Sequence, residues 1–463
     1  MTRTIAPFLA LLSATAILLI GNGLLGTLVP IRAGIDGFGT PTIGLFGSVY
    51  FAGFLVGCVG TPYIVRRAGH IRSFAALCAA ASAAPLIHAL FSDAWSWSAM
   101  RGLTGFCFAG LYMVIESWLN EQATNETRGR LFATYLVVNL LSVTAGQLLL
   151  NLSDPAAFGL FALCSILTSV ALVPVALTTS VQPAPIQTVS INLRRLYALS
   201  PVGLMGSFVI GLTNGPFWTL APLFAADSGL NTRDISFFMT AAIVGGALAQ
   251  FPIGRYSDRL DRRIIILLLC IGAVLGDIAL FYAGGIGSME ALLGSGFAFG
   301  VFSLTLYSVV VAHMNDHAQG ESFVSVSSGL LLVYAAGAII GPSAASLVAQ
   351  RFGMAAIFLF IAAIHIVYAL FTLARIRSRP ALTEEQRGEF VAVPFPQTQV
   401  AAPELDPRSE EDASYAAEGD ASEGASVQQG VAEFSEDFEM ENASEGSAMV
   451  SDDEAGPSPE KPS

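Results

Sequence analysis

The sequence predicts an all-α membrane protein: twelve transmembrane helices in two six-helix pseudo-symmetric bundles, followed by a disordered acidic C-terminal tail. Three observations support this fold class. Hydrophobic residues make up 54% of the 463 residues and charged residues only 12%, about half the charge of a soluble domain. Apolar runs long enough to cross a bilayer as helices recur along the chain. A stretch near the N-terminus also returns in the middle of the chain.

The returning stretch is NGLLGTLVP at 22–30, which reappears as NGPFWTLAP at 214–222. Asn, Gly, Thr, Leu and Pro recur in register, 192 residues apart. Later in each half, GFCFAG at 105–110 matches GFAFGV at 296–301 with an offset of 191. An even number of spans per copy inserts both copies in the same orientation, as in the parallel repeats of secondary transporters.

The spans and domains follow from the apolar runs and from the breaks between them. The expected spans are 7–30, 42–65, 72–91, 97–119, 130–152, 157–177, 199–224, 234–256, 263–284, 287–312, 322–349 and 354–374. The predicted domains are an N-terminal bundle at 1–178, a cytoplasmic linker at 179–198, a C-terminal bundle at 199–379 and a tail at 380–463.

Charge predicts the orientation. If the N-terminus is inside, sixteen arginines fall in cytoplasmic segments and only Arg32, Arg233 and Arg351 fall outside. This bias predicts a multi-pass protein of a bacterial inner membrane with both termini in the cytoplasm. Residues 1–379 carry a net charge of +5 and residues 380–463 carry −18. Such an acidic tail is expected to be disordered, and its partner stays unknown: it repels anionic lipid, tethers a basic partner or has no specific role.

The loop GRYSDRLDRR at 254–263 resembles the loop motif of the major facilitator superfamily. The matching residues are Gly254, Asp258, Arg259, Arg262 and Arg263. Asp261 stands where the motif has its second glycine. The resemblance implies a gating loop whose ion pairs hold one arrangement of the bundles and break in the other.

The corresponding loop of the first half, PYIVRRAGHIR at 62–72, is a weaker match. It keeps Arg67 and Arg72, but Arg66 stands where an aspartate is expected. Two other stretches, VIESWLNEQATNETRGR at 114–130 and the run at 312–342, are similar to the YcaD-type subgroup of the superfamily. The resemblance implies a central cavity lined by spans 1, 4, 7 and 10, with spans 3, 6, 9 and 12 outside.

Polar and aromatic residues in those four spans are the candidates for substrate contact. They are Asn22, Asn214, Thr27, Thr219, Tyr112, Trp218 and Tyr307. The asparagines either face each other across the cavity or form hydrogen bonds at glycine-mediated helix crossings. The aromatic residues either stack on a solute or pack in the core. Pro30 and Pro222 are expected to end or kink their helices.

Three charged residues inside spans are candidates for proton coupling, because charge in a bilayer needs a partner or a function. Arg101, followed by Gly105, is similar to a span-4 motif associated with proton coupling, or it is tied to carbonyls or an outer-loop carboxylate. Glu116 either pairs with Arg66, Arg67, Arg72 or Arg130 as a gate, carries a proton, or is an interfacial carboxylate. Asp277 is the third candidate, whereas His88 and His365 are expected to be packed and neutral.

Catalytic motifs are missing from the sequence. It contains no GxxxxGK[ST], GxSxG or HExxH, and its single lysine is Lys461. We therefore expect no enzyme activity, cofactor, metal or nucleic-acid partner. The predicted function is secondary transport of a small solute by alternating access in a monomer within the lipid bilayer, coupled to protons, with efflux favoured over uptake. The alternative is a transporter-like sensor or scaffold that acts through its acidic tail.

Overall fold

The computed structural model describes residues 8–177, 192–318 and 323–378, together with 380, 382, 387–388 and 390–393. Twelve helices in these ranges are long and apolar enough to cross a membrane, so the predicted all-α, twelve-span fold is confirmed. The chain divides into two units, Met1–Ser409 and Glu410–Ser463. The predicted linker, apart from 192–198, and most of the predicted disordered tail lie outside the described residues.

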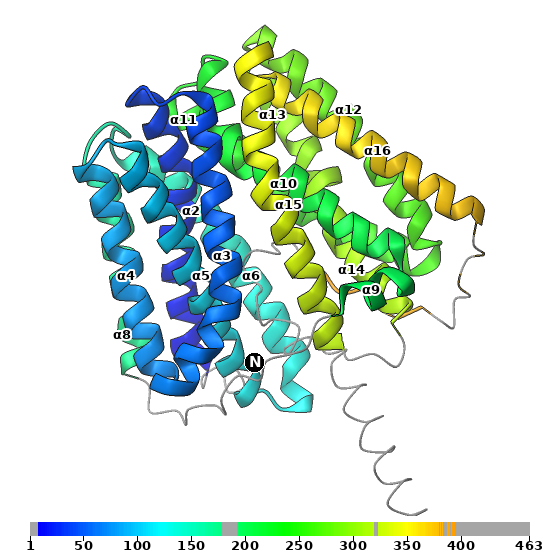
Figure 1. Cartoon of the computed structure of the whole chain (residues 1–463), viewed down its shortest axis with the longest axis horizontal. Helices are drawn as coiled ribbons and strands as arrows, with labels where there is room; N and C mark the ends of the chain where they lie inside the picture. The colour runs from blue at the N-terminus through cyan, green and yellow to red at the C-terminus, as the bar shows by residue number, and fades with distance from the viewer. Residues whose placement is uncertain are drawn as a thin grey trace, which may run out of the picture. The chain divides into compact units, whose positions relative to one another are not determined.

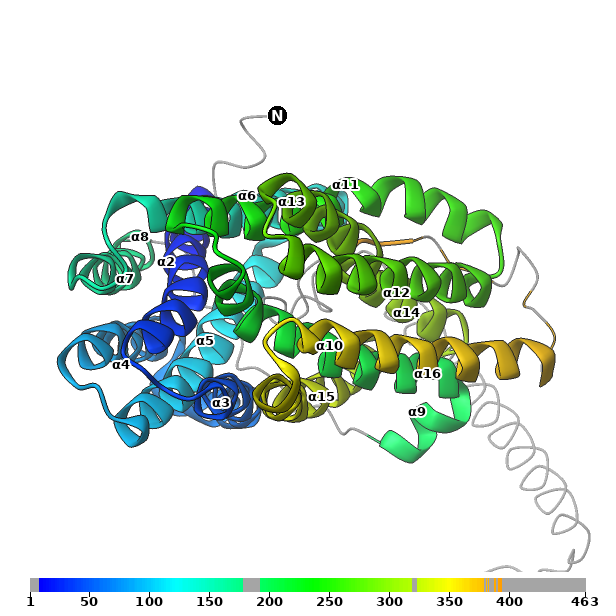
Figure 2. The ribbon, with the colours of Figure 1, turned by 90° about the horizontal axis from the view of Figure 1, so that it is seen from above.

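The helices of the two halves follow one another in the same order. The first half contains α2 (Leu9–Ile35), α3 (Thr40–Ala68), α4 (His70–Leu90), α5 (Ala94–Gln122), α6 (Asn125–Leu149), η2 (Leu150–Leu152), α7 (Gly159–Val170) and α8 (Leu172–Ala176). The second contains α9 (Leu193–Leu199), α10 (Pro201–Asp227), α11 (Thr232–Arg259), α12 (Arg262–Ile286), α13 (Met289–Phe299), η3 (Gly300–Leu304), α14 (Leu306–Asp316), α15 (Phe323–Phe352) and α16 (Ala356–Ser378). Figures 1 and 2 show the first set, in blue to cyan, beside the second, in green to yellow.

The sequence repeat is also a structural repeat. Helix α10 begins and ends 192 residues after α2, and α11 begins 192 residues after α3. Pro30 and Pro222 lie inside α2 and α10, each five residues before the last helical residue. The expectation that these prolines end their helices is therefore wrong. Each helix continues for more than a turn on the far side of its proline.

The offset changes to 195 in the later spans. A Cβ on Gly105 would lie 2.0 Å from the carbonyl oxygen of Tyr50, and one on Gly300 would lie 1.9 Å from that of Ala242. Tyr50 and Ala242 are themselves 192 residues apart, so Gly105 corresponds to Gly300. The match at 296–301 is thus wrong by about one helical turn. Helix α12 has 25 residues where α4 has 21, and this extra length shifts every later span of the second half.

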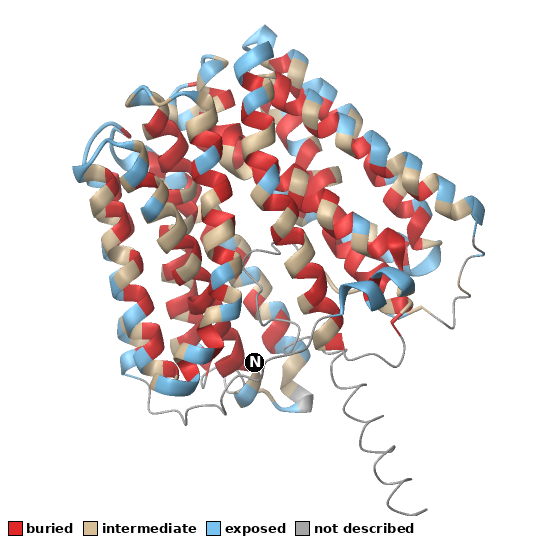
Figure 3. Ribbon diagram, in the orientation of Figure 1, coloured by how far each residue is buried: buried red, intermediate tan, exposed pale blue. Residues whose placement is uncertain are grey.

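The buried share differs between the spans (Figure 3). Span 4, in α5, is 83% buried, and spans 10 and 7 are 78% and 72% buried. Spans 3, 6, 9 and 12 have 50% or less of their residues buried. The outer faces are apolar and suit contact with lipid. Spans 4, 7 and 10 are thus the most enclosed, but spans 2, 5 and 8, at 50%, 39% and 50%, are no more buried than spans 3, 6, 9 and 12, so the buried share alone does not identify the spans that line a cavity.

Glycines allow the closest contacts between helices, and this generates a first prediction. In Gly105→Ala, the new methyl group collides with the Tyr50 carbonyl, which belongs to the α3 backbone and cannot rotate away. We expect a loss of about 1–3 kcal/mol in the free energy of unfolding, seen as a lower melting temperature in detergent. The control is Gly294→Ala, because no atom lies within 4 Å of a Cβ at that position. Equal melting temperatures for the two variants would contradict the packing described here.

Candidate functional site

A pocket lies where spans 1, 2, 4 and 5 of the first bundle meet span 7 of the second. Its lining consists of Asn22, Gly23, Gly26, Thr27, Val29, Pro30, Ile43, Phe46, Gly47, Tyr50, Phe51, Arg101, Val143, Gln147, Trp218 and Thr219. Four of the sequence candidates for substrate contact, Asn22, Thr27, Trp218 and Thr219, are in this lining. Of the proton-coupling candidates, Arg101 lines this pocket.

The bundles meet at one end of the spans. We call the end with the loops at 66–72, 122–130 and 255–263 the arginine-rich end. Between described residues of the two bundles, hydrogen bonds join Ser48 to Ser343 at 2.7 Å and Asn151 to Ser236 at 2.9 Å, both near the opposite end. Gly44 also approaches Ser346 so closely that a Cβ would lie 2.2 Å from its hydroxyl. The bundles are therefore closed together at the end away from the arginine-rich loops.

Hydrogen bonds within the first bundle fix several polar side chains of the pocket. The Asn22 amide donates to the Tyr112 hydroxyl at 2.9 Å. Thr27 donates to the side-chain oxygen of Gln147, whose amide donates to the carbonyl of Gly23 at 3.1 Å. Asn22 is thus held by span 4 through Tyr112, and Thr27 is held by span 5 through Gln147.

Arg101 is held by an aromatic ring. Its guanidinium lies 4.4 Å from the centre of the Tyr50 ring, a cation–π contact. The expected alternative was a tie to an outer-loop carboxylate, yet Asp36 pairs with Arg32 at 2.7 Å. Asp93 caps the start of α5 and accepts hydrogen bonds from Ser96. Neither of these carboxylates pairs with Arg101.

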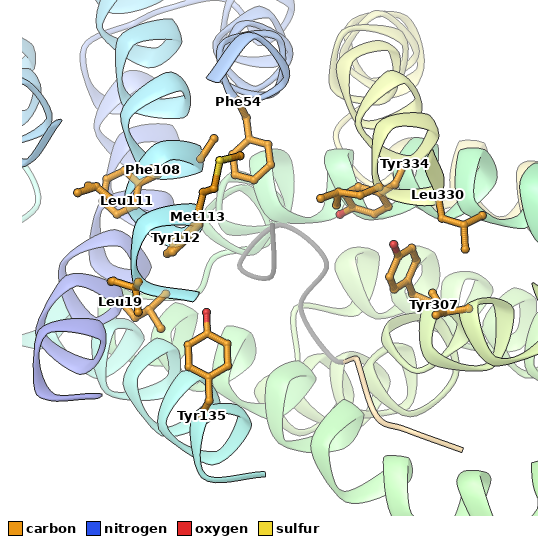
Figure 4. Close-up of a cluster of buried hydrophobic side chains, with 14 of the residues drawn as sticks. Leu19, Phe54, Phe108, Leu111, Tyr112, Met113, Tyr135, Tyr307, Leu330 and Tyr334 are labelled. Carbon is orange, nitrogen blue, oxygen red and sulfur yellow. The ribbon is translucent and has the colours of Figure 1, made fainter. Parts of the chain in front are cut away.

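The second half contributes less polarity to the pocket. Asn214 is buried in α10, and its side-chain oxygen accepts no hydrogen bond from a described residue. It lies outside the pocket lining, so Asn22 and Asn214 do not form a facing pair there. Tyr307 is buried and packs edge-on against Tyr334, with ring centres 5.5 Å apart. Figure 4 shows these two tyrosines with Tyr112 and Tyr135 of the first bundle.

Glu116 is fully buried and accepts a hydrogen bond from the hydroxyl of Tyr135 on α6. Among the described residues it forms no ion pair with Arg66, Arg67, Arg72 or Arg130. Arg66 instead lies over the ring of Tyr63 at 4.6 Å. The gate role and the proton role of Glu116 both stay predictions, and Tyr135 is the partner that sequence reasoning missed.

Asp277 and His365 form a pair inside the second bundle. Both side chains are fully buried, and the His365 Nδ1 lies 2.8 Å from Asp277 Oδ2. The other ring nitrogen lies 3.5 Å from the hydroxyl of Ser303 in η3, a π-helical turn within span 10. A carboxylate and a histidine in direct contact bind and release protons as a pair rather than independently. Sequence reasoning treated the two residues separately because 88 positions separate them.

The charged side chains of the second-half gating loop form their ion pairs within the second bundle. Arg262 pairs with Asp316 of α14 at 3.0 Å and with Asp258 at 3.4 Å. Asp261 caps the start of α12 through the amide of Arg263. Burial opposes the charge of Asp261, but hydrogen bonds from the Arg263 guanidinium and amide outweigh it and lower the pKa of this carboxyl. This capping role explains an aspartate at the motif's glycine position.

Residues 387–388 and 390–393, which we call the strap, pack against this loop. The amide of Gly388 donates to Asp316 at 3.0 Å, and the amide of Phe390 donates to Asp258 at 2.9 Å. The Phe390 ring covers Gly254, where a Cβ would lie 2.4 Å from it. Described residues are therefore present beyond the predicted tail boundary at 380, and the apolar side chains of Phe390, Val391 and Val393 pack against the core.

Comparison with known proteins identifies similar chains. The family model of the Major Facilitator Superfamily matches residues 203–416, and that of the sugar (and other) transporters matches residues 28–155. The chain is 30% identical over 371 residues to the uncharacterized MFS-type transporter YcaD of Escherichia coli O6:K15:H31 (strain 536), covering 79% of this chain and 95% of that protein. The same relation holds for YcaD of Escherichia coli O139:H28 (strain E24377A).

Solved structures share the fold at low sequence identity. The nucleoside transporter NupG has a TM-score of 0.69 at 13% identity, covering 81% of this chain and 100% of that one. A bacterial homologue of the human lysosomal transporter Spinster, in an inward-facing and occupied conformation, has a TM-score of 0.66 at 12% identity. That match covers 82% of this chain and 97% of the other.

A second prediction concerns the buried carboxylate of Glu116. Tyr135→Phe removes the hydroxyl that donates to Glu116, and a hydrogen bond to a buried charged group is worth about 1–3 kcal/mol. We expect a lower melting temperature in detergent. Tyr63→Phe is the control because its side chain is exposed and belongs to the same bundle. If Tyr135→Phe melts like the wild type, this hydrogen bond does not contribute to folding.

A third prediction concerns the strap. A chain shortened by deletion of 394–463 keeps the strap, and a chain lacking 387–463 loses it. We expect the first to melt like the full chain and the second to lose about 2 kcal/mol or more, because several hydrogen bonds to Arg262, Asp258 and Asp316 disappear. Melting curves of the three purified chains test this. Identical curves for the two truncated chains would show that the strap adds no stability.

Proposed function

The chain belongs to the major facilitator superfamily, and from that premise we propose that it moves a small solute across the membrane by alternating access, driven by protons. Members of this family are transporters rather than enzymes. The proposal places the protein in the inner membrane of a bacterium, with both termini in the cytoplasm. The arginine-rich end then faces the cytoplasm.

One observation carries the proposal: a pocket lies between two repeated bundles that are closed together at one end. Alternating access needs a binding site that both bundles share and a set of contacts that opens on one side. The pocket takes Asn22, Tyr50 and Arg101 from the first bundle and Trp218 from the second. The hydrogen bonds Ser48–Ser343 and Asn151–Ser236 are contacts that have to break when this end opens.

The direction of transport is the finer part of the proposal. The pocket lining combines aromatic, aliphatic and glycine residues with polar side chains, several of which form hydrogen bonds within the first bundle. Such a lining suits an amphipathic solute, and export of such compounds is favoured over uptake of a sugar-like nutrient. Flux in right-side-out and inverted vesicles under an imposed pH gradient would decide the direction. Symport accumulates solute in a vesicle that is acidic outside, whereas antiport needs a vesicle that is acidic inside.

The test of transport uses the purified chain in proteoliposomes. Solutes that raise its melting temperature identify ligands of the folded state, and each is then followed as labelled flux with and without an imposed pH gradient. Alternating access predicts flux of a stabilising ligand that Asn22→Ala weakens. Binding without any flux in liposomes would refute transport while leaving the pocket as a binding site.

A fourth prediction concerns Glu116 as the proton-linked group. Glu116→Gln keeps the size of the side chain and the hydrogen bond from Tyr135 but cannot ionise. We expect it to abolish the flux component driven by the pH gradient while solute exchange without a gradient persists. Glu121→Gln is the control, because it lies one helical turn further on α5 and is exposed. Asp277→Asn tests the second candidate in the same assay.

The outcomes separate the two carboxylates. If only Glu116→Gln removes the response to the pH gradient, the proton site lies in the first bundle. If only Asp277→Asn does so, it lies at the Asp277–His365 pair. If both variants respond like the wild type, neither carboxylate couples transport to protons.

A further inference from the structure

Arg101 is a cation inside span 4, in the first third of α5, and no described residue neutralises its charge. It lines the pocket and contacts the ring of Tyr50. In the described part of the chain, no carboxylate lies within ion-pair distance of its guanidinium and no group accepts a hydrogen bond from it; its Nε is buried without a partner. A guanidinium inside a membrane span is costly unless it finds water, a counter-ion or a ligand.

Carboxylates elsewhere in the first bundle cannot supply the missing charge. Glu116 is on the same helix, fifteen residues further, which corresponds to about 22 Å along the axis. Its carboxylate is bonded to Tyr135 on α6. Asp36 is engaged by Arg32, and Asp93 by the start of α5. The carboxylate that would neutralise Arg101 therefore has to come from outside this set.

The rest of the pocket is complementary to an apolar body with one acidic group. Its described lining contains no aspartate or glutamate. Aromatic rings of Phe46, Tyr50, Phe51 and Trp218 surround the space beside Arg101. Thr27 and Gln147 use their hydrogen bonds on each other and on the backbone. Arg101 thus provides the only charge among the described lining residues.

We propose that this pocket takes a small organic carboxylate with an aromatic or apolar body. The inference rests on the proposed transport function and gives its substrate class. The planar guanidinium holds a carboxylate at its edge through two parallel hydrogen bonds, while the Tyr50 ring covers one face of the guanidinium. The aromatic lining holds the body. A neutral analogue leaves the guanidinium without its partner, and a cationic analogue meets a like charge.

The test compares matched pairs of probes on the purified full-length chain. The probes are benzoate with benzamide and indole-3-acetate with indole-3-acetamide, together with benzylammonium as the cation. Calorimetry or thermal stabilisation at pH 7 measures binding. We expect each carboxylate to bind about tenfold or more tightly than its amide, since a charge-assisted hydrogen bond contributes this much or more. Benzylammonium is expected to show no binding.

Variants then assign the preference to Arg101. Arg101→Gln is expected to bind carboxylate and amide with equal affinity, and Arg101→Lys to keep part of the preference. Arg233→Gln is the control, because this arginine also lies on an aromatic ring, that of Phe237, but outside the pocket. The wild-type comparison of acid with amide stands even if Arg101→Gln fails to fold.

Several results would overturn the proposal. Equal or tighter binding of the amides or of benzylammonium would do so, as would failure of every carboxylate in the panel to bind. An acid preference that persists unchanged in Arg101→Gln would place the anion site elsewhere. Carboxylate binding that produces no flux in proteoliposomes would refute transport but keep the anion site. Flux of neutral or cationic solutes alone would keep transport and refute the substrate class.

Discussion

The close approach of helix backbones at glycines is the constraint on which the rest of the structure depends. In a bilayer the hydrophobic effect does not drive one helix against another, so packing and hydrogen bonds hold the bundles together. Gly53 and Gly105 bring α3 against α5, Gly245 brings α11 against α13, and Gly300 brings η3 against α11. These contacts leave no room for a methyl group. They also fix the position of Tyr50 beside Arg101, so a contact between helices shapes the candidate pocket.

The two halves share these contacts but not their charges. At the structural offset of 195, Tyr112 corresponds to Tyr307, Arg101 to Gly296 and Glu116 to Val311. The second half keeps the ring and omits both ionisable groups. Its own buried carboxylate, Asp277, lies in α12 and pairs with α16. The fold therefore repeats, while the buried charges of the two halves lie in different places: Arg101 and Glu116 in span 4 of the first half, and Asp277 in span 9 of the second.

The sequence predicted the spans and the repeat, because these depend on hydrophobic runs and matching letters. It also drew attention to Arg101 as a charge in an apolar setting, but as a candidate for proton coupling, a role that stays a prediction. It did not predict the partners. Tyr50, Gln147 and Tyr135 lie on neighbouring spans, and contacts between spans depend on helix rotation. Helices that are apolar on every side carry little information about rotation. The offset of 191 failed for a related reason. Span 10 has glycines at 296 and 300, one helical turn apart, and Gly105 can be aligned with either of them. The backbone contact of Gly300 with Ala242 shows that Gly300 is the equivalent residue.

The charged residues of the second-half gating loop make contacts other than those that the motif predicted. The motif predicted that ion pairs of Asp258 and Arg262 form in one arrangement of the two bundles and break in the other. In this structure Arg262 pairs with Asp316 of α14 and with Asp258, and Asp258 accepts a hydrogen bond from the strap; all of these contacts lie in the same half of the chain. Such contacts join α11, α12 and α14 into one body that can move as a unit. A gate that closes the arginine-rich end then needs either release of the strap or other residues, and the arginines around Arg66 in the first half are available for that contact.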